Sequence, residues 1–167
     1  MARTEKTAVM QTLRMLVGAV VAALFLMAVA LSVVLGFGAP ELWSVVLLLV
    51  LGGVVHLALD RIGYGLAPIS PTLPADEARS AAVRAFQSSL MRRLALAESV
   101  AIIGLVLAFV GGRTVLVYDL GAAVSVLLLG LHVWPSMRTV DRVVEQLERD
   151  GAHTGLRELL GLGGTSG

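Results

Sequence analysis

Three ionisable residues, His56, Glu98 and His132, stand inside long apolar runs of the sequence. Two imidazoles and a carboxylate can hold a divalent metal ion, and two histidines on different helices are what an axially ligated haem requires. Because successive runs alternate in direction when they form helical hairpins, we expect the three residues to share one layer. A structural role is the expected one, since Glu98 is close enough to the end of its run to reach water or to pair with Arg92 or Arg93.

A fourth residue of this kind, Asp119, lies about one turn into the last apolar run, at the opposite level from Glu98. We expect more than half of a layer of about 30 Å to separate the two carboxyls, so they form no continuous acid relay. The sequence has no Cys, and it has no phosphate-binding glycine loop, HExxH pair or Ser/His/Asp set with a recognisable spacing. We therefore predict no enzyme activity, no metal and no cofactor.

The four apolar runs cover 15–37, 42–59, 94–110 and 115–133. A helix needs roughly 17–25 mostly apolar residues to cross a hydrocarbon core of about 30 Å. The composition agrees, because 57% of the residues are hydrophobic and 15% are charged, against about 45–50% and about 25% in soluble domains. We predict an all-α integral membrane protein, a four-helix bundle of two tandem helical hairpins with an uncleaved first helix.

The basic residues are distributed unevenly between the connections. Arg113 is the only one expected on the side of the two short turns, and the other 12 of 13 are expected on the side of the termini and the central loop. Short loops rich in Lys and Arg stay in the cytoplasm, so we predict cytoplasmic termini in a bacterial inner membrane. A net charge of +1 without a basic run predicts no nucleic acid partner.

Shifting the chain by 76 positions superposes Gly36 on Gly112 and His56 on His132. This shift predicts a parallel internal repeat of the hairpin, about an axis along the membrane normal; a chance match in so biased a composition is the alternative. It also relates two stripes of small residues, whose one-per-turn spacing lets helix backbones pack closely in lipid. The residues of these stripes are Ala28, Ser32 and Gly36 in the first helix and Gly104, Ala108 and Gly112 in the third.

Two further segments are expected to face the cytoplasm. Three prolines keep 68–74 out of a helix, and 75–91 has helical periodicity, so it lies on the inner leaflet or continues into the third span. After the fourth span, an amphipathic helix has one apolar stripe that packs on this chain or on a partner. The predicted domains are a first transmembrane hairpin (1–60), a cytoplasmic proline-rich loop and amphipathic helix (61–93), a second transmembrane hairpin (94–134), a cytoplasmic amphipathic helix (135–160) and a disordered tail (161–167).

The two shorter runs, 42–59 and 94–110, carry charged residues at their cytoplasmic ends. These runs are long enough to span only when the flanking side chains extend into the lipid headgroups. The residues expected to do so are Asp60, Arg61, Arg92 and Arg93.

The segment 94–109, which reads LALAESVAIIGLVLAF, resembles the carboxylate-bearing helix of the c-subunit proteolipids of rotary ATP synthases. The resemblance implies that Glu98 carries a proton or a sodium ion. This chain differs from that family in its first helix, which lacks a dense glycine repeat, in the expected position of Glu98 near an interface instead of mid-membrane, and in the orientation that its charges predict.

The sequence as a whole favours a structural, accessory or assembly role in a membrane complex, with the lipid bilayer and other membrane subunits or a second copy as partners. The alternatives are an ion- or proton-handling subunit that uses Glu98, and a haem or metal protein that uses His56 and His132.

The predicted orientation can be tested with reporter fusions. Fusions after Ala39 and after Arg113 should report the outside, and fusions near Thr72 and after Gly167 should report the cytoplasm, because the basic residues are retained there. Alkaline phosphatase and green fluorescent protein activities measure the two sides. A cytoplasmic signal at position 39 would contradict the arrangement.

Overall fold

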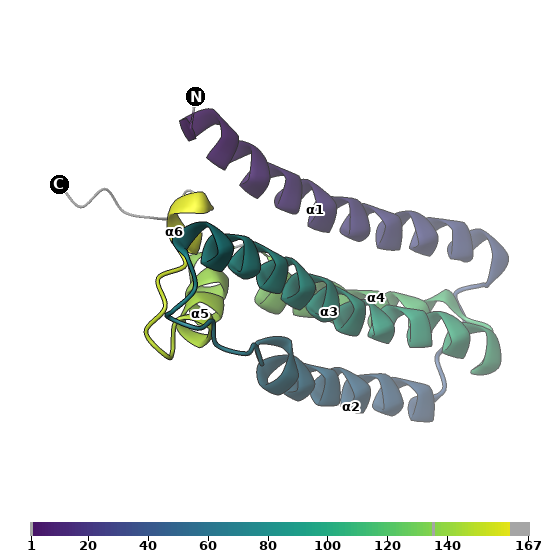
Figure 1. The fold of residues 1–167 in the computed structure, drawn as a ribbon. Coiled ribbons are helices and arrows are strands. Elements are labelled where there is room, and N and C mark those ends of the chain that lie inside the picture. The colour runs from purple at the N-terminus through teal and green to yellow at the C-terminus, as the bar shows by residue number, and fades with distance from the viewer. Residues whose placement is uncertain (1, 135, 161–167) are drawn as a thin grey trace.

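The structure is a computed structural model that describes residues 2–134 and 136–160, and these residues form helices and connecting loops (Figure 1). The expected disordered tail at 161–167 lies outside the described residues. Two helices continue into five-residue π-helical segments, here called η1 and η2. The elements are α1 (Ala2–Val34), α2 (Leu42–Ala58), η1 (Leu59–Gly63), α3 (Ala75–Val110), α4 (Val115–Leu128), η2 (Leu129–Val133), α5 (Met137–Leu147) and α6 (Leu156–Leu159).

Four of these helical stretches are long and apolar enough to cross a membrane, which confirms the predicted class of membrane protein. They are Gln11–Val34, Leu42–Gly63, Ala75–Val110 and Val115–Val133. The third is a single helix of 36 residues, equivalent to about 54 Å. The segment 75–91 therefore continues into the third span and does not form a separate helix, because neither Gly nor Pro interrupts the chain between Ala75 and Ile103.

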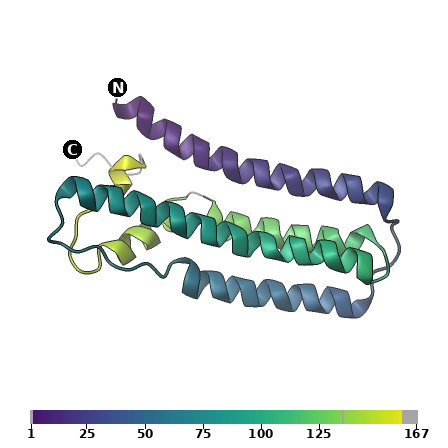
Figure 2. The same ribbon diagram turned by 45° about the vertical axis from the view of Figure 1, so that its right-hand side comes forward.

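α3 and α4 lie side by side at the centre of the molecule, and α1 and α2 flank this pair on opposite sides (Figures 1 and 2). The two helices of the first expected hairpin, α1 and α2, therefore do not pack against each other. The connection from α1 to α2 crosses over the turn between α3 and α4, where Val115 N donates to Gly36 O at 3.1 Å and Thr114 Oγ1 donates to Gly38 O at 2.6 Å. The two short turns hold each other and keep α1 and α2 apart.

The contact between α3 and α4 depends on two glycines. A Cβ atom added to Gly104 would lie 3.1 Å from the Cα of Gly121, and a Cβ added to Gly121 would lie equally close to the Cα of Gly104. Ala108, one turn further along α3, is fully buried. The small-residue stripe of the third span therefore packs as predicted at these two positions, against α4.

The stripe prediction is wrong at other positions. Gly112 lies in the turn after α3 with a φ of +84°, a backbone conformation that favours glycine. Gly36 lies beyond the end of α1 and has open space around it. Ala28 and Ser32 do face α4, but they line a cavity of about 450 Å³ between the two helices, because α1 packs loosely and is held there by the hydrogen bond from Tyr118 OH to Leu24 O at 3.0 Å.

The expected repeat stays a prediction. If the two halves were equivalent at an offset of 76, the π-helical segments would be 76 residues apart. They begin at Leu59 and Leu129, which are 70 residues apart, so the ends of α2 and α4 follow a different register from the two histidines.

The apolar stripe of α5 packs on this chain. Val140, Val143 and Leu147 are buried against Ala82 and Phe86 in the first half of α3. The expected single helix over 135–160 is in fact two helices, since α5 ends at Leu147 and the chain turns through Gly151 and Gly155, both with positive φ, before α6.

The packing of α3 on α4 predicts a position-specific effect of leucine. Gly104→Leu should lower the free energy of unfolding by about 1–3 kcal/mol or more, because the new side chain meets the backbone of α4. Gly53→Leu in α2 is the matched control, since nothing lies within 4 Å of a Cβ there. Thermal unfolding in detergent measures both. Equal tolerance at the two positions would show that the glycine contact does not hold the helices.

Candidate functional site

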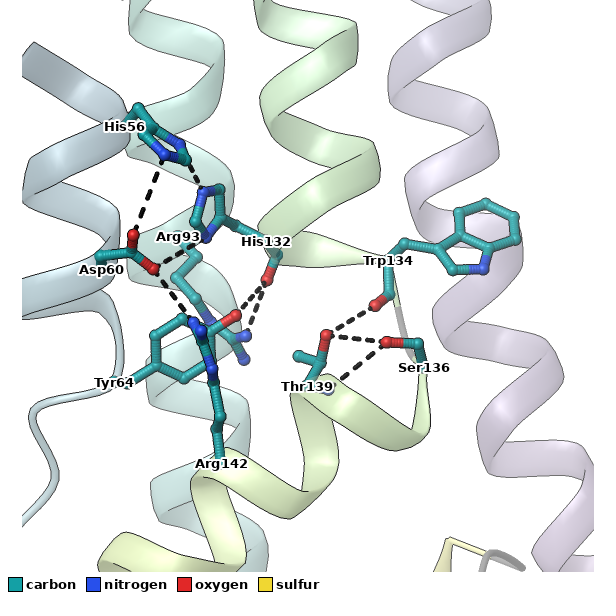
Figure 3. Close-up of polar contacts among 9 residues, drawn as sticks. All are labelled: His56, Asp60, Tyr64, Arg93, His132, Trp134, Ser136, Thr139 and Arg142. Carbon is teal, nitrogen blue, oxygen red and sulfur yellow. Dashed lines mark hydrogen bonds and ion pairs between the residues drawn. The ribbon is translucent and has the colours of Figure 1, made fainter. Parts of the chain in front are cut away.

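The candidate site lies where the second and fourth spans end. There both helices widen into π-helical turns, η1 and η2, a feature found frequently at functional sites. η1 carries Asp60 and η2 carries His132, while His56 stands in the last turn of α2. Figure 3 shows the side chains of these three residues turned toward one another beside α5. The site thus joins two spans and a helix that follows them.

The two histidines contact each other directly. His132 Nε2 and His56 Nδ1 share a hydrogen bond of 2.9 Å, and the ring centroids are 4.9 Å apart in an edge-on arrangement. His132 is buried, with 4% of its surface exposed, whereas the His56 side chain is 44% exposed. The structure therefore places the two histidines next to each other, as expected from the sequence.

Asp60 faces the second nitrogen of each histidine ring. Its Oδ2 lies 3.9 Å from His56 Nε2, and its Oδ1 lies 3.9 Å from His132 Nδ1. The same Oδ1 accepts a hydrogen bond of 3.0 Å from Arg142 Nη1 of α5. We expected Asp60 only to extend into the headgroups. Its spacing of four residues from His56 is the sequence signal that indicates a shared helix face.

Arg93 is the most unexpected residue of the site, because it is completely buried. Its Nη1 donates to His132 O at 2.7 Å and its Nε donates to Ser89 O at 3.3 Å. The guanidinium carbon lies 4.6 Å from the centre of the Tyr64 ring, a distance typical of cation–π contact. The expectation that Arg93 extends into the headgroups or pairs with Glu98 is wrong, because η1 and η2 enclose it.

Gly63 makes room for this buried arginine. A Cβ added to Gly63 would lie 2.8 Å from Arg93 Cγ. The carbonyl of Gly63 accepts a hydrogen bond of 2.7 Å from Ser89 Oγ. Gly63 of η1 therefore contacts α3 twice, at the Arg93 side chain and at the Ser89 hydroxyl.

The start of α5 is fixed by hydrogen bonds that place Arg142 (Figure 3). Ser136 Oγ accepts from Thr139 N at 3.4 Å, and Thr139 Oγ1 donates to Trp134 O at 3.2 Å. This is the helix-capping geometry that Ser at an N-cap provides. One turn later Arg142 reaches Asp60, and its guanidinium carbon lies 5.2 Å from the Tyr64 ring centre.

A cavity of about 160 Å³ opens beside the histidines. It separates η1 and η2 from the first two turns of α5. The residues that line it are His56, Asp60, Tyr64, Leu131, His132, Arg138, Thr139 and Arg142. Small ions and protons from solution can reach the pair through it.

Glu98 does not join the histidines, so the expected single layer of three residues is wrong. It lines a separate cavity of about 190 Å³ with Met27 of α1, Ile102 of α3 and Tyr118 of α4. The reason is depth along the bundle: Ser125 Oγ of α4 donates to Ala97 O at 2.7 Å, and His132 follows Ser125 by seven residues, equivalent to about 10 Å. Ala97, one position earlier, is fully buried in the helix core, and Glu98 is turned toward α1.

Asp119 lines the cavity on the other side of α1, together with Phe25 and Ser32. Glu98 and Asp119 thus lie in two different cavities that α1 separates. Across the described residues, neither carboxyl makes a hydrogen bond or an ion pair.

The histidine pair does not have the geometry of the alternatives that sequence suggested. Two axial ligands on opposite sides of a haem iron need their nitrogens about 4 Å apart, twice an ordinary metal–nitrogen distance, whereas the facing nitrogens are 2.9 Å apart and share a hydrogen bond. Within 2–134 and 136–160, no group of three His, Cys, Asp or Glu residues is arranged to hold a metal ion. The arrangement of the two histidines therefore fits neither an axially ligated haem nor a divalent metal ion.

Comparisons with protein-family models, curated proteins and solved structures found no match to this chain.

The buried guanidinium predicts different outcomes at two adjacent arginines. Arg93→Lys should lower the free energy of unfolding by about 1–3 kcal/mol, because an ammonium group cannot bond both carbonyls and stack on Tyr64. Arg92→Lys should have little effect, since Arg92 is exposed. Thermal unfolding in detergent compares them, and equal effects would contradict the role assigned to Arg93.

Proposed function

We propose that the protein is a non-catalytic multi-pass membrane protein that assembles with another membrane protein, and that α1 is its docking helix. The proposal includes an inner-membrane location with both termini in the cytoplasm, by the distribution of basic residues. It rests on how loosely α1 is attached to the other three spans. Large apolar side chains along α1 are exposed, among them Phe25 at 69% and Val33 at 86%.

One observation carries the proposal: the carboxyls of Glu98 and Asp119 line cavities on the two sides of α1 without a partner among the described residues. Twelve residues separate Glu98 from the end of α3 at Val110, equivalent to about 18 Å of helix. In a hydrocarbon core of about 30 Å this leaves Glu98 about 12 Å from the opposite face, deeper than the single turn expected from the sequence. A carboxyl so deep is costly without a polar partner.

A transmembrane helix that carries a hydrogen-bond donor is the occupant that fits these cavities. The walls around Glu98 are otherwise apolar, with Met27, Ile102 and Leu105. Helices in lipid associate through close packing and interhelical hydrogen bonds. A partner helix against α1 would fill the apolar walls and give the carboxyl a donor.

The second candidate function is transfer of a proton or sodium ion by Glu98. The resemblance of 94–109 to the c-subunit carboxylate helix supports it, as does the partly buried position of Glu98 in its cavity. In that case the cavity would be the site where the ion is exchanged. Haem or metal binding has no such support, because the histidines bond to each other.

A photocrosslinking experiment tests the docking proposal. A photoreactive residue at Ile102, beside Glu98, should link to a helix of another protein or of a second copy in native membranes. The same residue at Leu57 in α2 should not. The two positions are matched, because both side chains are 59% exposed.

Variants of Glu98 separate docking from ion transfer. Glu98→Ala should weaken the crosslink by on the order of 3- to 10-fold, the effect of one intramembrane hydrogen bond, and Glu98→Gln should keep it because an amide still bonds a donor. Crosslinks of equal strength at Leu57 and Ile102 would contradict docking at α1. Proton or sodium flux in vesicles that Glu98→Gln abolishes would instead support the second candidate.

A further inference from the structure

His56, His132 and Asp60 contact one another in a closed cluster. When both histidines are neutral, one ring nitrogen lacks the proton that its contact with Asp60 needs. Each ring directs one nitrogen at the other ring, at 2.9 Å, and the second nitrogen at a different oxygen of Asp60, at 3.9 Å. All four imidazole nitrogens therefore face a polar atom inside the cluster. How many protons these nitrogens carry decides whether the contacts attract or repel.

Two neutral imidazoles carry two N–H groups between them. One N–H is used in the bond between the rings, whichever histidine donates. The donating ring then directs a lone pair at the Asp60 carboxylate, and only the other ring directs an N–H at it. With two protons, one of the two contacts with Asp60 is thus repulsive in either tautomer.

A third proton removes this conflict. One N–H joins the rings, and the two outer nitrogens both become donors toward Asp60, so that a charge of +1 on the pair faces the carboxylate charge of −1. His132 Nδ1 is a buried atom without a hydrogen bond in the structure. Such an atom is costly to bury unless it interacts with an opposite charge, and the third proton makes Asp60 that opposite charge.

The geometry points to a proton-binding site in which His56, His132 and Asp60 together bind one proton beyond those of two neutral imidazoles and a carboxylate. The proton comes from solution through the cavity of about 160 Å³ that these residues line. Asp60 is 42% exposed and His56 44% exposed, so neither side chain is enclosed by the protein. The proposal does not depend on docking at α1, because it concerns other residues on other helices.

The charged groups around the site come from each helix packed on it. α3 contributes Arg93, which bonds His132 O, and α5 contributes Arg142, which bonds Asp60, and Arg138, which lines the cavity. The phenol of Tyr64 donates to His132 O at 3.3 Å. Asp60 is thus the one carboxylate among three guanidinium groups here, in the part of the chain that the structure describes.

Proton binding is therefore coupled to α5. Arg142 and the histidine pair share Asp60 Oδ1 as a counter-ion. When the pair takes up a proton, the carboxylate is attracted to both cations, and its bond to Arg142 weakens. Linkage requires the reverse as well: removing Arg142 strengthens proton binding. The site connects the pH of the solution to the contact of α5 with the membrane spans.

Nuclear magnetic resonance of histidine-labelled protein in detergent tests the site. The chain has three histidines, and the exposed His153, which lies outside the cluster, serves as an internal reference. His56 and His132 should follow one common step worth one proton between about pH 5 and pH 8. Separate titrations of His56 and His132, each like that of His153, would overturn the proposal.

Variants at partly exposed positions give the second test. Asp60→Asn should lower the midpoint of the common step by about one pH unit, because the opposite charge is lost, and Arg142→Gln should raise it. Arg149→Gln is the matched control, since Arg149 pairs with Asp150 on the surface of the protein, and it should leave the midpoint unchanged. A midpoint that changes with neither the Asp60 nor the Arg142 variant would overturn the proposal.

Discussion

The close contact of α3 and α4 is the constraint on which the other elements depend. Gly104 and Gly121 have no side chains to separate the two backbones, so the helices meet where lipid itself gives no hydrophobic drive for association. Gly52 allows a similar fit on α2, because a Cβ there would lie 2.6 Å from Val124 Cγ1 of α4. With α2 and α4 so placed, the π-helical turns at their ends are brought together beside Arg93. The histidine pair is therefore a product of helix packing more than of local sequence.

Arg93 converts that packing into a polar site. A guanidinium without exposed surface is unusual in any protein, and here no carboxylate neutralises it within the described residues. Its Nε and Nη1 instead bond the carbonyls of Ser89 and His132, its Nη2 is buried without a hydrogen-bond partner, and its face lies on Tyr64. π-helical turns leave backbone carbonyls outside the regular hydrogen-bond ladder. The buried arginine bonds the carbonyl of His132 in η2, which gives its charge a polar partner among the spans.

The spans, the apolar stripe of α5 and the meeting of the two histidines could be predicted from the sequence, because they follow from hydropathy, periodicity and direction along the chain. The relative depth of neighbouring helices could not. Ala97 lies level with Ser125, about two turns from His132, which is enough to separate Glu98 from the histidines. The burial of Arg93 could not be predicted from the sequence either, since hydropathy places an arginine at a membrane interface. Asp60 could have been found, because it shares a helix face with His56.

The length of α3 has a mechanical consequence. Its first half carries the apolar contact with α5, and its second half carries the glycine contact with α4, yet the 36 residues form one uninterrupted helix. A rod of about 54 Å that tilts by roughly 5° about its centre moves both ends by about 2 Å in opposite directions. A displacement of α5 on one side of the membrane would thus shift the turn at Gly111 and Gly112 on the other side. That turn holds the connection between α1 and α2, so α3 links the layer that contains α5 mechanically to the far ends of all four spans.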